Sequence, residues 1–188
     1  MLELNLLNEN MNEFKKLINK KVEQLFLVVW PPWGQLNEAN INFSFGFVFN
    51  DEPTRLCIIS VDKNELWSPH ISFELLPKIE FSFSDFYHRM NEWMIATEET
   101  DLILDYEYYN VTNCDFFEKI INSEIIGIEK ISIMGDLHPF GIKILFNEDY
   151  IISMPISDGN SVETSKFNRN DNIKNFEKIG KIVFEQII

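Results

Sequence analysis

The sequence contains two pairs of matching stretches, offset by 103 and by 97 residues, and this repeat limits the folds that the chain can adopt. Residues 14–25 align without gaps with residues 117–128, and residues 43–51 align without gaps with residues 140–148. The two matches occur in the same order along the chain. Self-similarity of this kind indicates two copies of one structural unit, although chance similarity between stretches rich in Ile, Phe and Asn is the alternative. We predict an internal repeat, residues 11–75 and 114–167.

Each copy has the pattern of one helix followed by strands. Apolar residues recur at helical spacing in residues 10–19 and again in residues 115–122. Residues 41–50 alternate in polarity and place four phenylalanines on one face, which is typical of a strand. Turn residues then connect consecutive strands of each copy into hairpins. The predicted strands are residues 22–30, 41–50, 55–61 and 70–75 in the first copy, and 125–134, 142–146, 150–157 and 162–167 in the second.

The segment between the copies predicts a helix over residues 84–97, with Ser84 and Asp85 at its start, and a strand over residues 102–109. Residues 172–188 are compatible with a short helix followed by a strand or with one longer helix, and Gly180 favours the strand. We therefore predict one compact domain over residues 1–188. Its fold class is α+β: two mainly antiparallel β-sheets from a duplicated helix–β-β-β(β) unit, flanked by a few helices.

The net charge of the chain argues against two classes of partner, nucleic acids and anionic membranes. The 188 residues include 30 acidic and 16 basic side chains, for a net charge of −14, yet 45% of the chain is hydrophobic and 17 residues are Phe. Such a chain can bury a core, but its surface repels nucleic-acid backbones and anionic membranes. We expect no direct nucleic acid or membrane binding. Cys57 and Cys114 have apolar or aromatic neighbours and read as buried free thiols, and no secretory signal is visible, so a cytoplasmic location is expected.

The sequence contains no H-E-x-x-H, C-x-x-C or G-x-S-x-G motif, no Walker loop and no dinucleotide-binding glycine motif. His70, His88 and His138 have no partner at metal-ligand spacing. Asp149 and residues 158–160 lack the spacing of a calcium loop, and hairpin turns explain them better. We therefore expect no catalytic residue, no metal and no cofactor, and we interpret the chain as a protein that is not an enzyme.

A dense acidic run is the candidate partner-binding site. Its five residues are Glu98, Glu99, Asp101, Asp105 and Glu107. Three of them share a strand parity, so they could line one solvent-facing strand face, and nearby tyrosines could add contacts. A solvated strand face is the alternative interpretation. The loop from Trp30 to Trp33, stiffened by two prolines, is either a second recognition loop or a lid over the core.

Several features together resemble the immunity proteins of bacterial toxin–immunity systems. They are hydrophobic hairpins that end in Asn/Asp-rich turns, a Met/Trp-bearing helix over residues 84–97, and the stretch 158–163. The duplicated sheet units also resemble the Whirly fold. The resemblance implies that the chain binds a cognate basic toxin domain, such as a nuclease, in the same cytoplasm and occludes its active site. The alternative is a non-catalytic binding or scaffold module, which could be a homodimer.

Overall fold

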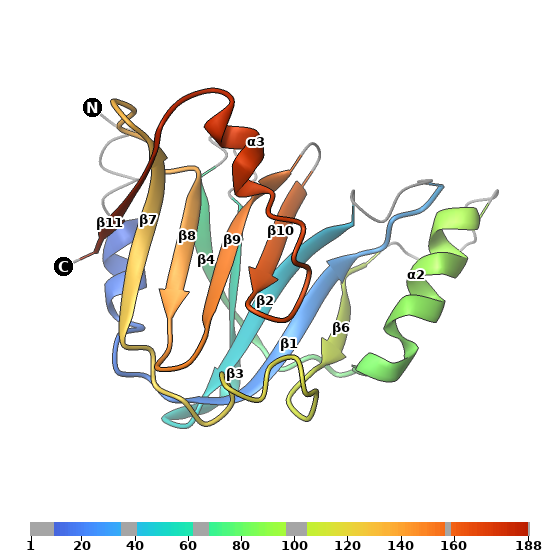
Figure 1. Ribbon diagram of the computed structural model, residues 1–188. Coiled ribbons are helices and arrows are strands. Elements are labelled where there is room, and N and C mark those ends of the chain that lie inside the picture. Colours follow the sequence, from blue (N-terminus) through green and yellow to red (C-terminus); the bar gives the residue numbers. More distant parts are fainter. Residues whose placement is uncertain (1–9, 35–40, 62–67, 97–104, 157–158, 188) are drawn as a thin grey trace.

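A computed structural model describes residues 10–34, 41–61, 68–96, 105–156 and 159–187 of the chain. These residues form two β-sheets that face each other, with short helices at their margins (Figure 1). The fold class is α+β with mostly antiparallel sheets, as predicted. The first sheet has the order β4-β3-β2-β1-β6-β5, with β1 Val22–Trp30, β2 Asn42–Phe49, β3 Glu52–Val61, β4 Pro69–Leu75, β5 Phe81–Ser82 and β6 Glu107–Asn110. The second has the order β10-β9-β8-β7-β11, with β7 Gly127–Ile133, β8 Gly141–Leu145, β9 Tyr150–Ile156, β10 Gly159–Thr164 and β11 Ile182–Gln186.

The two sheets are built by the same chain path. Each begins with four consecutive antiparallel strands, continues through a helix, and ends with a strand that returns to pair antiparallel with the first one. The returning strand is β6 beside β1 in the first sheet and β11 beside β7 in the second. The helices are α2, Phe86–Ile95, and α3, Ile173–Glu177. Only the first sheet gains a further strand, the two-residue β5, which pairs parallel with β6.

The two copies contact each other through pairs of equivalent residues, which gives them a local pseudo-two-fold relation. Asn19 and Asn122 hold the same position in the sequence repeat, and both adopt positive φ, 70° and 60°. The bridge between Lys21 and Glu124 joins two further equivalent positions. Four backbone hydrogen bonds surround it in two symmetric pairs: Asn19 N to Ile125 O (2.8 Å) with Asn122 N to Val22 O (2.8 Å), and Val22 N to Ser123 O (3.0 Å) with Ile125 N to Lys20 O (3.0 Å). This symmetry favours a common origin of the two copies, which remains a prediction.

The helices differ from the sequence prediction in three places. Residues 10–15 are helical, but residues 115–122 form successive turns, so the prediction of a second helix there is wrong. Its hydrogen bonds mostly span three residues, as from Phe117 N to Cys114 O, and left-handed Asn122 ends the segment where it pairs with β1. The helix predicted over residues 84–97 is divided into a 3-10 turn, η2 Phe83–Asp85, and α2. Asp85 makes no capping hydrogen bond; Ser82 caps η2 instead.

The main core lies between the sheets. The phenylalanines of β2 that were predicted to share a face, Phe43, Phe45, Phe47 and Phe49, are all buried there, with Ile142, Ile144 and Phe146 of the second copy opposite. The repeat aligns Phe140 with Phe43 and so predicts that it faces the same core, but it lies on the outer side of the second sheet and stacks on Phe176 with 3.9 Å between ring centroids. Phe140 precedes the first residue of β8, Gly141, so the inward–outward alternation of side chains along that strand does not extend to it.

A buried asparagine links the sheets directly. Asn160 of β10 donates through its side chain to Phe43 O (2.6 Å), and its backbone N donates to Asn42 Oδ1 (3.0 Å) on β2. Ser153 Oγ donates to the other end of the same amide, Asn160 Oδ1 (3.0 Å). The sequence alone suggested only a tight turn for Asn160. Its side chain is instead a polar connection inside an otherwise apolar interface.

Further expectations concern the two cysteines, the Trp30–Trp33 loop and membrane-spanning helices. Cys57 is buried and free, and burial raises the pKa of its thiol to about 12, whereas Cys114 is free but only partly buried. Trp30 and Trp33 both stay partly exposed, and Trp30 packs edge-on against Tyr106 with 5.2 Å between ring centroids. Among the described residues, none of the helices has the length and apolar character that crossing a membrane requires.

Candidate functional site

The structure describes two of the five residues of the predicted acidic site, Asp105 and Glu107, and places them in different environments. Glu98, Glu99 and Asp101 lie outside the described residues. Asp105 is exposed, and its carboxylate accepts a hydrogen bond from Tyr106 N (2.8 Å). Glu107 is only 8% exposed. Its side chain turns toward α2, so the prediction that it faces solvent beside Asp105 is wrong.

Glu107 anchors α2 to β6. Its carboxylate accepts two hydrogen bonds from Arg89, one from Nε at 3.2 Å and one from Nη2, and further hydrogen bonds from the Tyr109 hydroxyl and from Trp93 Nε1 (3.2 Å). The Arg89 guanidinium also stacks over the Phe81 ring at 4.0 Å. Burial raises the pKa of Glu107, but hydrogen bonds from Arg89 and Tyr109 outweigh it and leave this pKa below its ordinary value. Glu107 therefore forms a structural ion pair with Arg89.

An acidic groove lies beyond this anchor, at the outer edge of the first sheet. It has a volume of about 820 Å³ and is lined by two segments: Glu80, Phe81, Ser82, Phe83 and Ser84 on one side, and Asn110, Asn113, Cys114, Asp115 and Phe116 on the other. Phe116 is 40% exposed. None of these lining residues carries a positive charge. We define these ten residues as the edge groove.

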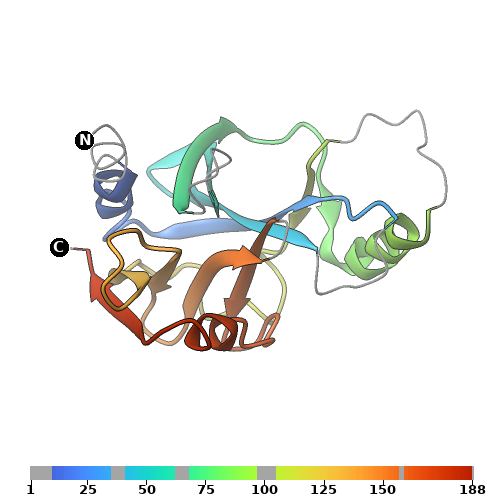
Figure 2. The same cartoon turned by 90° about the horizontal axis from the view of Figure 1, so that it is seen from above.

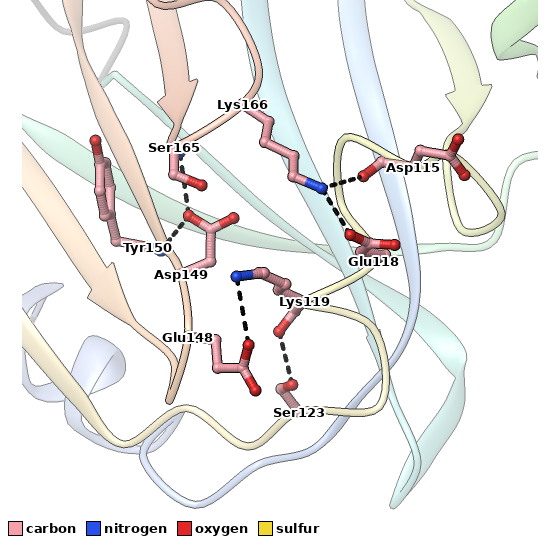
Figure 3. Close-up of polar contacts among 9 residues, drawn as sticks. All are labelled: Asp115, Glu118, Lys119, Ser123, Glu148, Asp149, Tyr150, Ser165 and Lys166. Atoms are coloured by element: carbon pink, nitrogen blue, oxygen red, sulfur yellow. Dashed lines mark hydrogen bonds and ion pairs between the residues drawn. The ribbon is translucent and has the colours of Figure 1, made fainter.

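Ion pairs with the second sheet hold one wall of the edge groove in place (Figure 3). Lys166, just after β10, pairs with Glu118 (2.6 Å) and donates to the backbone oxygen of Asp115 (3.4 Å). Lys119 pairs with Glu148 (3.3 Å) in the hairpin between β8 and β9. The Asp115 carboxylate itself points away from Lys166, as Figure 3 shows, so Lys166 pairs with Glu118 and only its contact with Asp115 O is a hydrogen bond.

Asp149 is a turn residue, as the sequence suggested. Its backbone oxygen accepts from Phe146 N (2.9 Å), and its Oδ1 accepts from Tyr150 N (2.8 Å) and Ser165 N (3.1 Å), which connects the hairpin to the end of β10 (Figure 3). Its Oδ2 is buried and has no hydrogen-bond partner among the described atoms. Within the described ranges, no three His, Cys, Asp or Glu side chains are close enough together to hold a metal ion.

A second hollow lies on the outer face of the first sheet, which curls so strongly that its distant strands approach each other. The Tyr108 hydroxyl of β6 donates to Glu74 Oε2 of β4 (3.2 Å), although three strands separate β6 from β4. The hollow below has a volume of about 340 Å³, and its lining residues are Val28, Ser44, Ile58, Ser60, Val61, His70, Ser72, Glu74, Tyr106 and Tyr108. We call it the concave pocket.

Neither the edge groove nor the concave pocket was predicted from the sequence. The edge groove joins segments about thirty residues apart, and only the docking of α2 and the turns after β6 bring them together. A signal was present in residues 81–84, where phenylalanine and serine alternate, because a two-residue edge strand followed by a turn leaves such rings partly exposed. Comparisons of the chain with protein-family models, with curated proteins and with solved structures found no match.

Proposed function

We propose that this protein is an immunity protein, which binds a cognate basic toxin domain in the cytoplasm and neutralises it by occluding its active site. A nuclease is the toxin class that fits best, because its active site is built to attract a polyanion. The observation that carries the proposal is the edge groove: a large exposed groove with two carboxylates, three phenylalanines and no basic side chain among its described lining residues.

The chemistry of the edge groove suits lysine and arginine side chains. Glu80 and Asp115 are exposed, and they share the groove lining with Phe83 and Phe116, whose rings contact each other edge-on with 6.2 Å between centroids. A cation that enters can interact with a carboxylate and with an aromatic face at once. The net charge of −14 adds long-range attraction, which raises the association rate with a basic partner.

Binding to a basic toxin domain encoded beside this gene tests the proposal. Glu80→Gln with Asp115→Asn should slow association and weaken binding about tenfold or more, since interfacial charges act mainly on the association rate. The matched control, Glu177→Gln with Asp136→Asn, removes two exposed acids elsewhere and should change binding far less. Both variants should melt like the wild type, because exposed carboxylates contribute little to stability.

Protection of cells that express the toxin supplies the functional readout. The groove variant should protect less well than the control variant at equal protein level. Equal protection by both variants would mean that the binding surface lies elsewhere. The acidic run predicted from the sequence would then be tested by one combined variant with Glu98→Gln, Glu99→Gln, Asp101→Asn and Asp105→Asn. If no toxin domain binds the wild type, the proposal is wrong.

The second candidate function, a homodimeric scaffold, is favoured by one exposed apolar group. Met134 and Leu137 follow β7, and Ile179 lies in the turn before β11. These turns are adjacent, because Met134 N donates to Lys181 O (2.7 Å). Sedimentation of the wild type and of Leu137→Ser with Ile179→Ser tests it: a scaffold would sediment as a dimer that the double variant dissociates, whereas an immunity protein that acts alone would be a monomer in both.

A further inference from the structure

The concave pocket exists because small side chains stand at the centre of a curved sheet. In Figure 2 the first sheet bends away from the second, drawn in orange and red, so that β4 and β6 rise on the same side of β1 and β2. Ser44 on β2 lies beside Ser60 on β3 in the strand register, and Ser72 lies on β4. Larger side chains at these positions would fill the hollow, whereas the serines leave about 340 Å³ open.

The hydroxyl groups of these three serines have no hydrogen-bond partner among the described residues. Ser44 is only 6% exposed, and a hydroxyl on so buried a residue is normally hydrogen-bonded, as Ser153 is to Asn160 (3.0 Å). The Ser44 oxygen is nevertheless not sealed off, so it opens into the concave pocket that Ser44 lines. The pocket therefore has an unpaired hydroxyl at its bottom and two more on its walls.

The mouth of the concave pocket carries a fixed acceptor. The Tyr108 hydroxyl donates to Glu74 Oε2 (3.2 Å), which holds this exposed carboxylate in place and leaves its other oxygen to accept. Burial and the neighbouring Glu74 carboxylate raise the pKa of Tyr108, so its hydroxyl stays protonated and remains a donor. Beside Ser44 at the bottom, Val28 and Ile58 are buried and apolar.

The charges of the pocket select the class of ligand. Glu74 is the one carboxylate among the described lining residues, and no lysine or arginine is among them, so an anion would be repelled at the mouth. A cation that reached the bottom would lose its hydration without meeting a counter-charge. A hydrocarbon would leave the hydroxyls of Ser44 and Ser60 unpaired. A neutral molecule with several hydroxyl groups avoids all three costs, because hydroxyls both donate and accept.

We infer that the concave pocket binds a neutral polyhydroxyl molecule of the size of a sugar. The serines exchange hydrogen bonds with its hydroxyl groups, Glu74 accepts from one of them at the mouth, and its C–H groups lie against Val28 and Ile58. A volume of about 340 Å³ is at the lower end of the range of pockets that bind small ligands. This inference does not depend on the toxin proposal, because it concerns a small molecule and a different surface from the edge groove.

Titration of the ¹⁵N-labelled full chain with glucose, galactose and mannose tests the inference. At least one of these sugars should produce saturable NMR shifts at the amides of Ser44, Ser60, Ser72 and Tyr108, with a Kd of about 1 mM or below. Ser44→Ala should weaken that binding about fivefold by removing a hydrogen bond, and should keep the wild-type melting temperature because the hydroxyl has no protein partner. Ser132→Ala, at a similarly buried serine on β7, should leave binding unchanged.

Charged relatives of the sugar that binds best test the choice of ligand class. Its uronic acid and its amino sugar should each bind at least about tenfold more weakly, and tighter binding of the amino sugar would overturn the neutral class. If no sugar produces saturable shifts at the four pocket residues by about 50 mM, the pocket holds only water and the inference is wrong. Unchanged binding by Ser44→Ala would overturn it too. Ser60→Phe should fill the pocket and abolish the shifts, and shifts that persist in this variant with a wild-type circular dichroism spectrum would place binding elsewhere.

Discussion

At the scale of single residues, two buried polar groups do most to fix how the elements meet. Asn160 joins β10 to β2, and Glu107 joins β6 to α2. We expect Asn160→Ala to lower the free energy of unfolding by about 2–3 kcal/mol, since it leaves Phe43 O and Ser153 Oγ without their partner. Asn175→Ala, an exposed asparagine on α3, should cost less than about 0.5 kcal/mol. Urea unfolding of both variants measures the difference, and similar losses would contradict it.

The Glu107 ion pair predicts a pH dependence of stability. Its folded-state pKa lies below the ordinary value, so its stabilisation is present above the pKa of the unfolded chain and is lost as pH falls through the folded pKa. Arg89→Ala should cost about 2 kcal/mol at pH 7, and less as pH falls through the lowered folded-state pKa of Glu107, because the carboxyl group then becomes neutral. Lys16→Ala, which breaks an exposed pair with Glu13, should cost about 0.3 kcal/mol. Urea unfolding from pH 3 to pH 7 tests this; a loss that does not vary with pH would contradict it.

At the scale of elements, the two left-handed asparagines mark where each copy enters its first strand. An asparagine tolerates positive φ, glycine accepts it freely, and alanine does not. Asn19→Ala and Asn122→Ala should therefore each cost about 1 kcal/mol, whereas Asn19→Gly and Asn122→Gly should be close to the wild type. Thermal unfolding of the four variants measures this. If the alanine and glycine variants agree, the backbone conformation is not the cause.

Strand positions could be predicted from the sequence, but the faces and partners of some elements could not. Residues 22–30 were predicted as a strand from their own side chains, and β1 has those bounds. The turns at 115–122 read as a helix because Phe117 and Ile120 have helical spacing; the pairing of Asn122 with β1 prevents that helix. Glu107 looked solvent-facing because sequence parity does not show which side α2 will cover. The edge groove and the concave pocket depend on the docking of α2 and the curling of a sheet, and a local pattern records neither.

At the scale of the whole molecule, the two copies share one core. Phe45 of the first copy contacts Phe117 of the second with 5.7 Å between ring centroids, and Phe43 contacts Phe167 at 5.9 Å. Their pseudo-two-fold relation also places the pairing of Lys21 with Glu124 between them. Because each sheet has one inner apolar face, neither copy can bury that face without the other.

Fragments of the chain test this dependence. Residues 1–112 and residues 113–188 should each be largely unfolded alone, since each would expose half of an apolar interface. Expressed together, they should assemble into a complex with the circular dichroism spectrum and cooperative melting of the intact chain, at a lower temperature because association costs entropy. Phe45→Ala in the first fragment should weaken assembly strongly, because it removes a buried ring from the shared core, whereas Phe184→Ala, a partly exposed ring on β11, should weaken it much less. If either fragment alone melts cooperatively, that copy is an independent folding unit, and the shared core is not what makes the fold.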